Sequence, residues 1–178
     1  TFREIPPIAN GMADRGAGRS VARADMNNDG LLDFYVQNNG GLFVSFPKDR
    51  SRLYVNVGKQ RTGTGNWLEL DLEGRIGHPD AFGTRLDLTL GGVVLKRRLL
   101  GDSPCLAANS RMIHFGLGTA TEATLLTIHW HTGTVQTLRG VPANQRITLL
   151  EPTVTGEGGS SISYNGSTLS LAVDVTNH

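Results

Sequence analysis

Four oxygen-bearing side chains recur at short intervals near the start of the chain. Asp25, Asn27, Asp29 and Asp33 fit the pattern D-x-N-x-D-G-x-x-D. Calcium is a hard cation that takes about six to eight oxygen ligands in a flexible shell, so side chains at alternate positions can surround one ion. The carbonyl oxygen of Leu31 can supply a further ligand. The pattern therefore predicts a Ca²⁺ site whose ligands are Asp25, Asn27, Asp29, Leu31 and Asp33.

The surroundings of these residues predict a β-hairpin rather than an EF-hand. Gly30 permits the sharp turn that folds the chain back on itself. An EF-hand needs a bidentate Glu at the last position of its loop and a helix on each side, and that position is Val36 here. The flanking segments, 20–23 and 32–36, have the composition of strands. The alternative is an Asp-rich turn that binds no metal.

Other residues with reactive side chains do not form a recognisable catalytic set. His129 and His131 are two apart in a strand pattern, and with His114 they could form a metal site with three histidine ligands. Nothing places His114 near the pair, so surface histidines that flank a core Trp130 are the better interpretation. Cys105 is the only cysteine and has no partner base, which favours a buried structural thiol. We therefore expect no enzymatic activity.

Composition excludes several broad classes. The formal net charge is +1, so no basic excess draws the chain to nucleic acid. The longest apolar runs are far shorter than a membrane span. Glycine is frequent, with 23 residues scattered between short apolar segments, which is typical of many tight turns.

Apolar and polar residues alternate with a period of two in much of the chain, and this pattern is typical of strands with one buried face. Leu68, Leu70 and Leu72 show it first, and Leu86 and Leu88 repeat it. No long segment shows helical amphipathicity. Further strands are expected at 93–100, 112–117, 124–130, 135–138 and 146–151, with turns at 91–92, 132–134 and 142–144. The predicted fold class is all-β, with a β-sandwich or open barrel after residue 66.

Changes in composition divide the chain into four parts. A polar segment at 60–66 separates an N-terminal β unit, residues 1–60, from the sandwich, residues 66–152. A Gly/Ser-rich linker follows at 153–161. The last part, 162–178, is predicted to be a strand or hairpin, because Asn165-Gly166 is a hairpin-turn signal.

These residues resemble a known pair of families. The segments 18–25, 33–38 and 53–56 resemble an FG-GAP/VCBS repeat, the propeller blade of integrin-α heads. Later segments resemble the ASPIC/UnbV domain that follows such repeats in cartilage acidic protein-like proteins. The segments that carry this second likeness are Asn66-Trp67-Leu68, Gly83-Thr84-Arg85-Leu86, His114-Phe115-Gly116-Leu117-Gly118 and Asn144-Gln145.

The resemblance implies a secreted, extracellular or cell-surface protein with a calcium-dependent adhesion or scaffold role and no known chemistry. One departure from the family concerns the number of repeats. Relatives carry several repeats that close a propeller, whereas this chain shows one, and a lone blade leaves two open sheet edges.

The C-terminal segment that begins at Thr168 and ends at Thr176 alternates apolar and polar residues without interruption. A strand of this kind needs a host sheet. It can pair with its own sandwich, belong to a further domain, or add to the sheet of another copy. The third option predicts a homo-oligomer or filament joined through residues 168–176, and thus a surface or fibre subunit. The alternative function is a monomeric adhesion module that recognises a glycan or a protein.

Overall fold

The computed structural model describes residues 16, 18–38, 50–58, 65–101, 107–153, 162–164, 167–169 and 173–177, the last three ranges by their backbone alone. Every regular element among these residues is a strand, which confirms the predicted all-β class. None of them belongs to a helix that is long and apolar enough to cross a membrane. The chain divides into two compact units. Unit 1 contains residues 1–57 and 102–110, and unit 2 contains residues 58–101 and 111–178.

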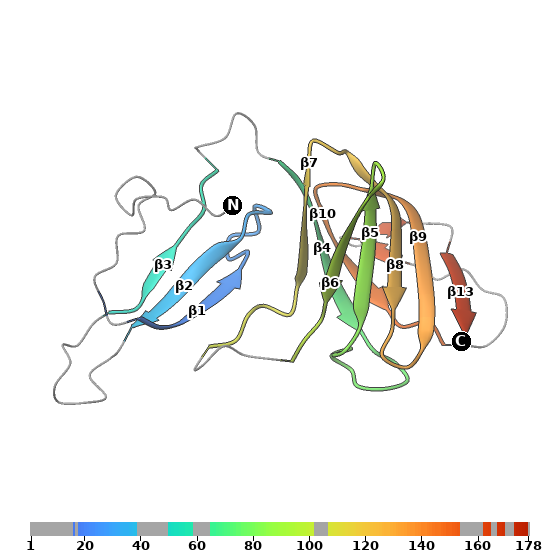
Figure 1. Cartoon of the computed structure of the whole chain (residues 1–178), viewed down its shortest axis with the longest axis horizontal. Coiled ribbons are helices and arrows are strands. Elements are labelled where there is room, and N and C mark those ends of the chain that lie inside the picture. The colour runs from blue at the N-terminus through green and yellow to red at the C-terminus, as the bar shows by residue number, and fades with distance from the viewer. Residues whose placement is uncertain are drawn as a thin grey trace. The chain divides into compact units, whose positions relative to one another are not determined.

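Unit 1 has a three-stranded antiparallel sheet in which the strands follow chain order (Figure 1). Its strands are β1 (Gly18–Ala24), β2 (Asp33–Asn38) and β3 (Arg52–Tyr54). The predicted hairpin is therefore present, because β1 and β2 are antiparallel neighbours on either side of the Asp-rich loop.

A segment from much later in the chain also belongs to unit 1. The N–H of Ser110 donates to the carbonyl of Arg23 (3.0 Å), and the N–H of Arg23 donates to Oδ1 of Asn109 (3.1 Å). The backbone N–H and carbonyl of Arg23 in β1 are thus both hydrogen-bonded to residues of the range 66–152, which was predicted to belong to the sandwich. The joint expected at 60–66 is close to the observed boundary after residue 57, but the return of 102–110 to unit 1 was not foreseen.

Unit 2 contains two five-stranded sheets. The first has the order β12-β11-β10-β4-β7, and the second has the order β13-β9-β8-β5-β6. The first eight of these strands along the chain are β4 (Asn66–Glu73), β5 (Arg85–Leu90), β6 (Val93–Arg98), β7 (Ile113–Gly118), β8 (Glu122–His129), β9 (Thr134–Pro142), β10 (Gln145–Leu150) and β11 (Ile162–Tyr164). The last two are β12 (Ser167–Leu169) and β13 (Val173–Asn177).

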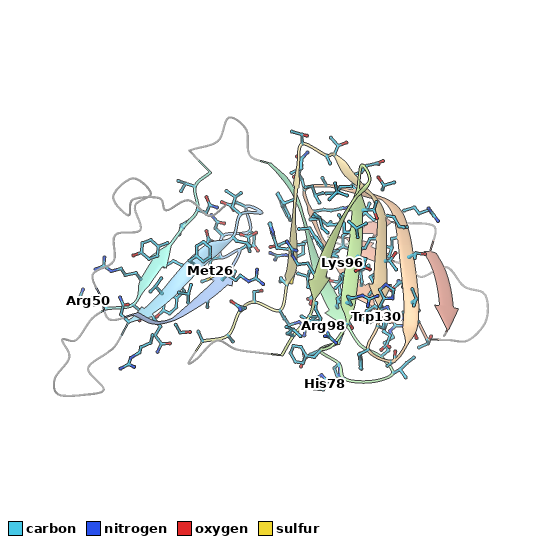
Figure 2. All side chains as sticks on the ribbon, in the orientation of Figure 1. Met26, Arg50, His78, Lys96, Arg98 and Trp130 are labelled. Atoms are coloured by element: carbon cyan, nitrogen blue, oxygen red, sulfur yellow. The ribbon has the colours of Figure 1, made fainter. Side chains whose placement is uncertain are left out.

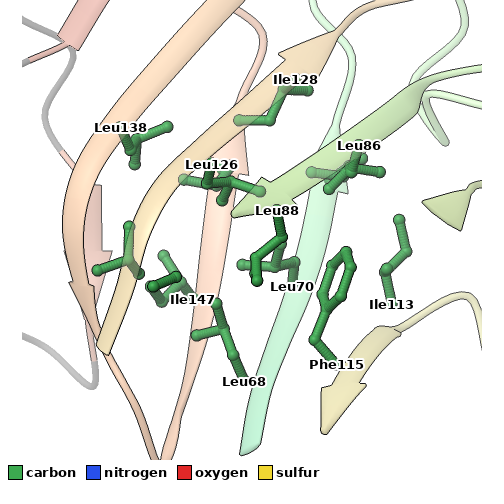
Figure 3. Close-up of a cluster of buried hydrophobic side chains, with 14 of the residues drawn as sticks. Leu68, Leu70, Leu86, Leu88, Ile113, Phe115, Leu126, Ile128, Leu138 and Ile147 are labelled. Atoms are coloured by element: carbon green, nitrogen blue, oxygen red, sulfur yellow. The ribbon is translucent and has the colours of Figure 1, made fainter. Parts of the chain in front are cut away.

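The leucines that alternate along β4 and β5 meet in one hydrophobic core. Leu68 and Leu70 from the first sheet, and Leu86 and Leu88 from the second, are all 0% exposed (Figure 3). Phe115 of β7 is the largest fully buried side chain of this cluster. Each such side chain stabilises the fold by about 1.5–3 kcal/mol relative to exposure. Two sheets that share one core are consistent with the predicted β-sandwich.

Turns between the strands follow the glycine and asparagine positions. Gly91 and Gly92 have φ values of 51° and 92° and join β5 to β6 in a two-residue hairpin loop. Both central residues of a type I′ turn need positive φ, which glycine adopts without steric cost. Asn144, with φ of 60°, turns the chain between β9 and β10.

The C-terminal part differs from its prediction in one respect. Residues 168–176 do not form a single strand, because β12 and β13 lie in different sheets. Within the described backbone, β11 pairs with β10 of the same chain, and β13 pairs with β9 of the same chain. β11 and β12 are antiparallel, with Tyr164 opposite Ser167, as expected for a hairpin at Asn165-Gly166, although these two residues lie outside the described residues. The uninterrupted alternation was a misleading signal here.

Candidate metal centre

The predicted calcium-binding loop connects β1 to β2. Ala24 pairs with Asp33, so the loop leaves and re-enters the sheet at adjacent positions. Two loop residues have left-handed backbone conformations, Asn28 with φ of 61° and Gly30 with φ of 81°. These conformations tighten the loop enough to close it, and Gly30 adopts its own without a Cβ penalty. The turn predicted at Gly30 is confirmed.

Asp33 anchors the loop from its C-terminal end. Its side chain is 0% exposed. Oδ2 accepts the N–H of Met26 (2.9 Å), and Oδ1 accepts the N–H of Asn56 (2.8 Å), which follows β3. Because a buried carboxylate without partners is very costly, these two bonds explain how Asp33 is tolerated inside the unit. They also join the loop to the segment after β3.

Asp25 organises the loop from its N-terminal end. Its Oδ1 accepts the N–H of Asp29 (3.1 Å), and its Oδ2 accepts the N–H of Gly30 (2.9 Å). Asn27 takes part in the same network, since its Oδ1 accepts the N–H of Asp29 (3.2 Å) and its Nδ2 donates to Oδ2 of Asp29 (2.9 Å). Oδ1 of Asp29 accepts the N–H of Leu31 (2.8 Å). The five predicted ligand residues therefore lie in one hydrogen-bonded loop.

The donor chemistry of this loop fits calcium, although the carboxylates do not converge on one point. A carboxylate oxygen has two acceptor positions, and each oxygen of Asp33 accepts one backbone N–H. Asn27 and Asp29 are exposed, whereas Asp33 is buried. In the described part of the chain, no three His, Cys, Asp or Glu residues are grouped so that they could hold a metal ion. Calcium binding therefore stays a prediction that rests on the donor set.

One partner of the loop has no signal in the sequence. Asn56 belongs to the segment 53–56 that resembles the FG-GAP/VCBS repeat, and its N–H donates to Oδ1 of Asp33 across 23 residues of sequence. A backbone N–H carries no residue-type signal, so this contact could not be found from the pattern of side chains.

The histidines lie apart, which supports their interpretation as surface residues. His129 ends β8, and its Nε2 lies 3.7 Å from Oδ2 of Asp87. His131 lies in the turn after β8, so the strand pattern that was expected to contain both histidines is wrong for His131. Its Nε2 accepts the N–H of His78 (3.1 Å). His114 is on β7, in the other sheet. Cys105 lies outside the described residues.

Trp130 between these two histidines is a core residue, as predicted. It is 3% exposed, and its Nε1 donates to Oε1 of Gln136 (3.1 Å). Figure 2 shows Trp130 and His78 near one end of the sandwich strands.

A buried carboxylate organises the same end of unit 2. Glu151 is 0% exposed, and its Oε2 accepts the N–H groups of Arg75 (2.9 Å) and Ile76 (3.0 Å). Its Oε1 accepts the hydroxyl of Thr132. Burial alone would raise the pKa of Glu151, but the hydrogen bonds from Thr132, Ile76 and Arg75 and the charge of His131 outweigh it, so the pKa is lowered from its ordinary value of 4.5. No pattern in the sequence singles out this residue.

A shared guanidinium joins three parts of unit 2. Arg111 donates to Oδ1 of Asp80 (2.7 Å), to Oδ1 of Asp71 (2.8 Å) and to the carbonyl of Leu72 (2.8 Å). Burial alone would lower the pKa of Arg111, but Asp71, Asp80 and Glu73 together raise it. The bonds to Asp71 and Leu72 anchor Arg111 to β4, and the bond to Asp80 ties the long loop between β4 and β5 to this anchor.

Two of the motifs noted in the sequence meet in space. Asn144 Nδ2 donates to Oδ1 of Asn66 (2.9 Å), and Oδ1 of Asn144 accepts the N–H of Trp67 (3.2 Å). The N–H of Asn144 donates to the carbonyl of Trp67 (2.6 Å), and Nδ2 of Asn66 donates to the carbonyl of Ala120 (2.9 Å). These bonds fix the start of β4 against the turn before β10, so this pair of motifs has a structural role.

The fold and these motifs define an all-β protein with a sandwich unit and a separate three-stranded unit. Residues 74–156, which all fall in unit 2 except for the segment 102–110, match the family model described as ASPIC and UnbV. This part of the predicted resemblance is confirmed, and domains of this family are found in extracellular proteins. The match does not include the calcium loop, so the FG-GAP/VCBS resemblance of the N-terminal part stays a prediction. No curated protein matches the chain.

Proposed function

We propose that this protein is a non-enzymatic extracellular module in which one Ca²⁺ ion stabilises the hairpin of unit 1. The observation that carries the proposal is the Asp33 carboxylate, which is fully buried at the end of an oxygen-rich loop and already held by two backbone N–H groups. Such an oriented carboxylate loses little freedom when it binds a cation. With the side-chain oxygens of Asp25, Asn27 and Asp29, it offers the hard oxygen donors that calcium prefers.

The resident ion would act as a structural clip. When bound, Ca²⁺ supplies positive charge to a loop that contains three carboxylates. The residues of the chain keep the loop closed through their backbone contacts, and strands on both sides of the loop leave no helix pair that could swing apart on binding. This arrangement supports a stabilising role rather than a sensing role.

Asp29→Asn tests the site by calcium titration calorimetry. The substitution keeps the side-chain shape and one carbonyl oxygen but removes one charge from the loop. We expect its affinity for Ca²⁺ to be about tenfold weaker than that of the parent, because calcium affinity follows the number of charged ligands.

Glu73→Gln is the matched control, because Glu73 is an exposed carboxylate on β4 in unit 2. We expect it to bind Ca²⁺ like the parent. The proposal fails if the parent shows no binding, or if both variants bind equally well.

We propose that the module is a monomer with its tail folded back, and not a fibre subunit. The support is the pairing of the described tail strands, since β13 pairs along five positions with β9 of the same chain. Strand addition to another copy through residues 168–176 would need this pairing to open first. The monomeric binding module, which recognises a glycan or protein, is therefore the function that we favour.

A further inference from the structure

The outer face of the second sheet carries a compact group of basic side chains on neighbouring strands. Cross-strand register places Arg85 of β5 opposite Arg98 of β6 on one side and opposite His129 of β8 on the other. Asp87, two residues along β5, pairs with Lys96 of β6. Figure 2 labels Lys96 and Arg98, the two members of this group that belong to β6. We call Arg85, Lys96, Arg98 and His129 the basic patch.

These side chains share the solvent-facing side of the sheet. Leu86 and Leu88, which alternate with Arg85 and Asp87 along β5, are 0% exposed in the core. The period of two therefore directs Arg85 and Asp87 outward. The side chains of Arg85 and Lys96 are 52% and 68% exposed, so their charged ends are accessible.

The positive charge of the patch exceeds the negative charge of the carboxylate beside it. Among the described side chains, Asp87 is the carboxylate that lies between these bases, 3.7 Å from Nε of Arg85, 3.9 Å from Nζ of Lys96 and 3.7 Å from Nε2 of His129. None of these distances is that of a hydrogen bond, and Oδ1 of Asp87 is shielded from solvent without a hydrogen-bond donor. A single loosely held carboxylate thus faces three bases. The whole chain carries a net charge of only +1, so positive charge is concentrated here.

A like-charged pair makes this concentration unfavourable in the unbound protein. Arg85 and Arg98 stand directly opposite each other on adjacent strands. Side chains in such a pair have Cβ atoms about 4.5–5.5 Å apart, and like charges at this position destabilise a sheet. Two guanidinium groups this close can both donate to the same sulfate or carboxylate group, which would remove the repulsion.

We propose that the basic patch binds a polyanionic polysaccharide, recognised through its repeated sulfate or carboxylate groups. One anion on an exposed arginine gains at most about fivefold in affinity, so a useful affinity needs several anions on one chain. Thr89 and Thr127 flank Asp87 on the same outward side and add hydroxyl groups that can bond to sugar hydroxyls. This inference names the ligand class of the proposed binding module, but it does not depend on the calcium site.

Single-stranded nucleic acid is the competing polyanion, and the patch fits it less well. Proteins that bind it usually stack the bases on aromatic side chains. The patch and its neighbours on β5, β6 and β8 have no Phe, Tyr or Trp, since the described outward residues there are basic, acidic, hydroxyl-bearing or aliphatic.

The test compares charge variants of the full chain for binding to heparin at low and physiological salt. We expect Arg85→Ser/Arg98→Ser to bind about tenfold more weakly than the parent, since each exposed contact contributes a few-fold. We expect Asp87→Asn to bind about threefold more tightly, because it removes the negative charge that lies within 4 Å of Arg85, Lys96 and His129. Binding of the parent should weaken as salt rises.

Arg19→Ser/Arg75→Ser is the matched control, because it removes the same charge from two exposed arginines outside the patch. It should bind heparin like the parent, and neutral dextran should not bind. The inference is overturned if the control loses as much affinity as Arg85→Ser/Arg98→Ser, or if single-stranded DNA of equal charge binds more tightly than heparin. Repeating the titration in excess chelator separates the two proposals, since heparin binding that persists without Ca²⁺ supports the patch whatever the loop binds.

Discussion

At the scale of single residues, two buried carboxylates hold this protein's loops. Asp33 in unit 1 and Glu151 in unit 2 are both 0% exposed, and each accepts two backbone N–H groups. Backbone amides are fixed in position, so a carboxylate that accepts them orders the loop that carries them.

Glu151 makes the stability of unit 2 sensitive to acid. Its pKa is lowered in the folded state, so the charged form is favoured by folding. Its contribution is fully present above the ordinary value of 4.5 and is lost as the pH falls through the lower folded value. We expect Glu151→Gln to lower the free energy of unfolding at pH 7 by about 1–3 kcal/mol, and the difference from the parent to shrink below pH 4.5. Urea denaturation followed by tryptophan emission at several pH values measures both effects.

The same series with Glu73→Gln separates this effect from a general loss of charge. Glu73 is exposed and should leave the free energy of unfolding at pH 7 within about 0.5 kcal/mol of the parent. A constant difference between Glu151→Gln and the parent at all pH values would contradict the assignment.

Residue types in the sequence indicated the loop but not its contacts. Alternating Asp and Asn oxygens and Gly30 were enough to predict a closed hairpin loop. They did not reveal that the amide of Asn56 completes the site of Asp33, or that Glu151 is buried, because the N–H groups of Asn56, Arg75 and Ile76 that hold these carboxylates are backbone groups far away in sequence.

At the scale of strands, period-two alternation correctly predicted which side chains are buried in strands that have turn residues at both ends. The leucines of β4 and β5 are buried as expected, and β5 and β6 meet at Gly91-Gly92. Pairing partners were harder to foresee. β10 lies parallel to β4, a contact between segments about 80 residues apart that local patterns do not encode.

The tail strands cover sheet edges, and their removal should expose them. β11 lies along β10, and β13 lies along β9, so a chain that ends at residue 153 leaves both β10 and β9 unpaired on one side. Open edges pair readily with other chains. We expect this truncated protein to form oligomers that the full chain does not form, as measured by analytical ultracentrifugation.

The opposite result would restore the filament prediction. If the full chain assembles and the truncated chain stays monomeric, then residues 162–178 join copies to each other, and the monomeric binding module is wrong. Val175→Pro in the full-length chain is the control for a loss of pairing without a loss of residues. Proline removes the backbone donor of Val175, one position of β13 that pairs with β9.

At the scale of the whole molecule, the two units can be followed separately. Trp67 and Trp130 are the only tryptophans, and both belong to unit 2. Tyr35 and Tyr54 belong to unit 1. We expect excess chelator to lower the melting temperature of the calorimetric transition of unit 1 by about 10 °C, since saturating calcium would contribute about 2–3 kcal/mol to so small a unit.

The unfolding transition of unit 2, followed by tryptophan emission, should then have the same midpoint temperature with and without chelator. If the tryptophan transition falls together with the calorimetric one, calcium stabilises more than unit 1. If neither transition moves, the loop is an Asp-rich turn without a metal.

The return of residues 107–110 to β1 has a consequence for how the chain is made. Unit 1 receives its last residues only after β4, β5 and β6 have been synthesised, because Asn109 and Ser110 follow all three along the chain. At about 5–20 residues per second, the N–H and carbonyl of Arg23 wait roughly 3–11 s after β3 has been translated before their partners leave the ribosome. The order of translation and the order of completion therefore differ, because unit 1 is started first but is completed only after the first three strands of unit 2 have been made.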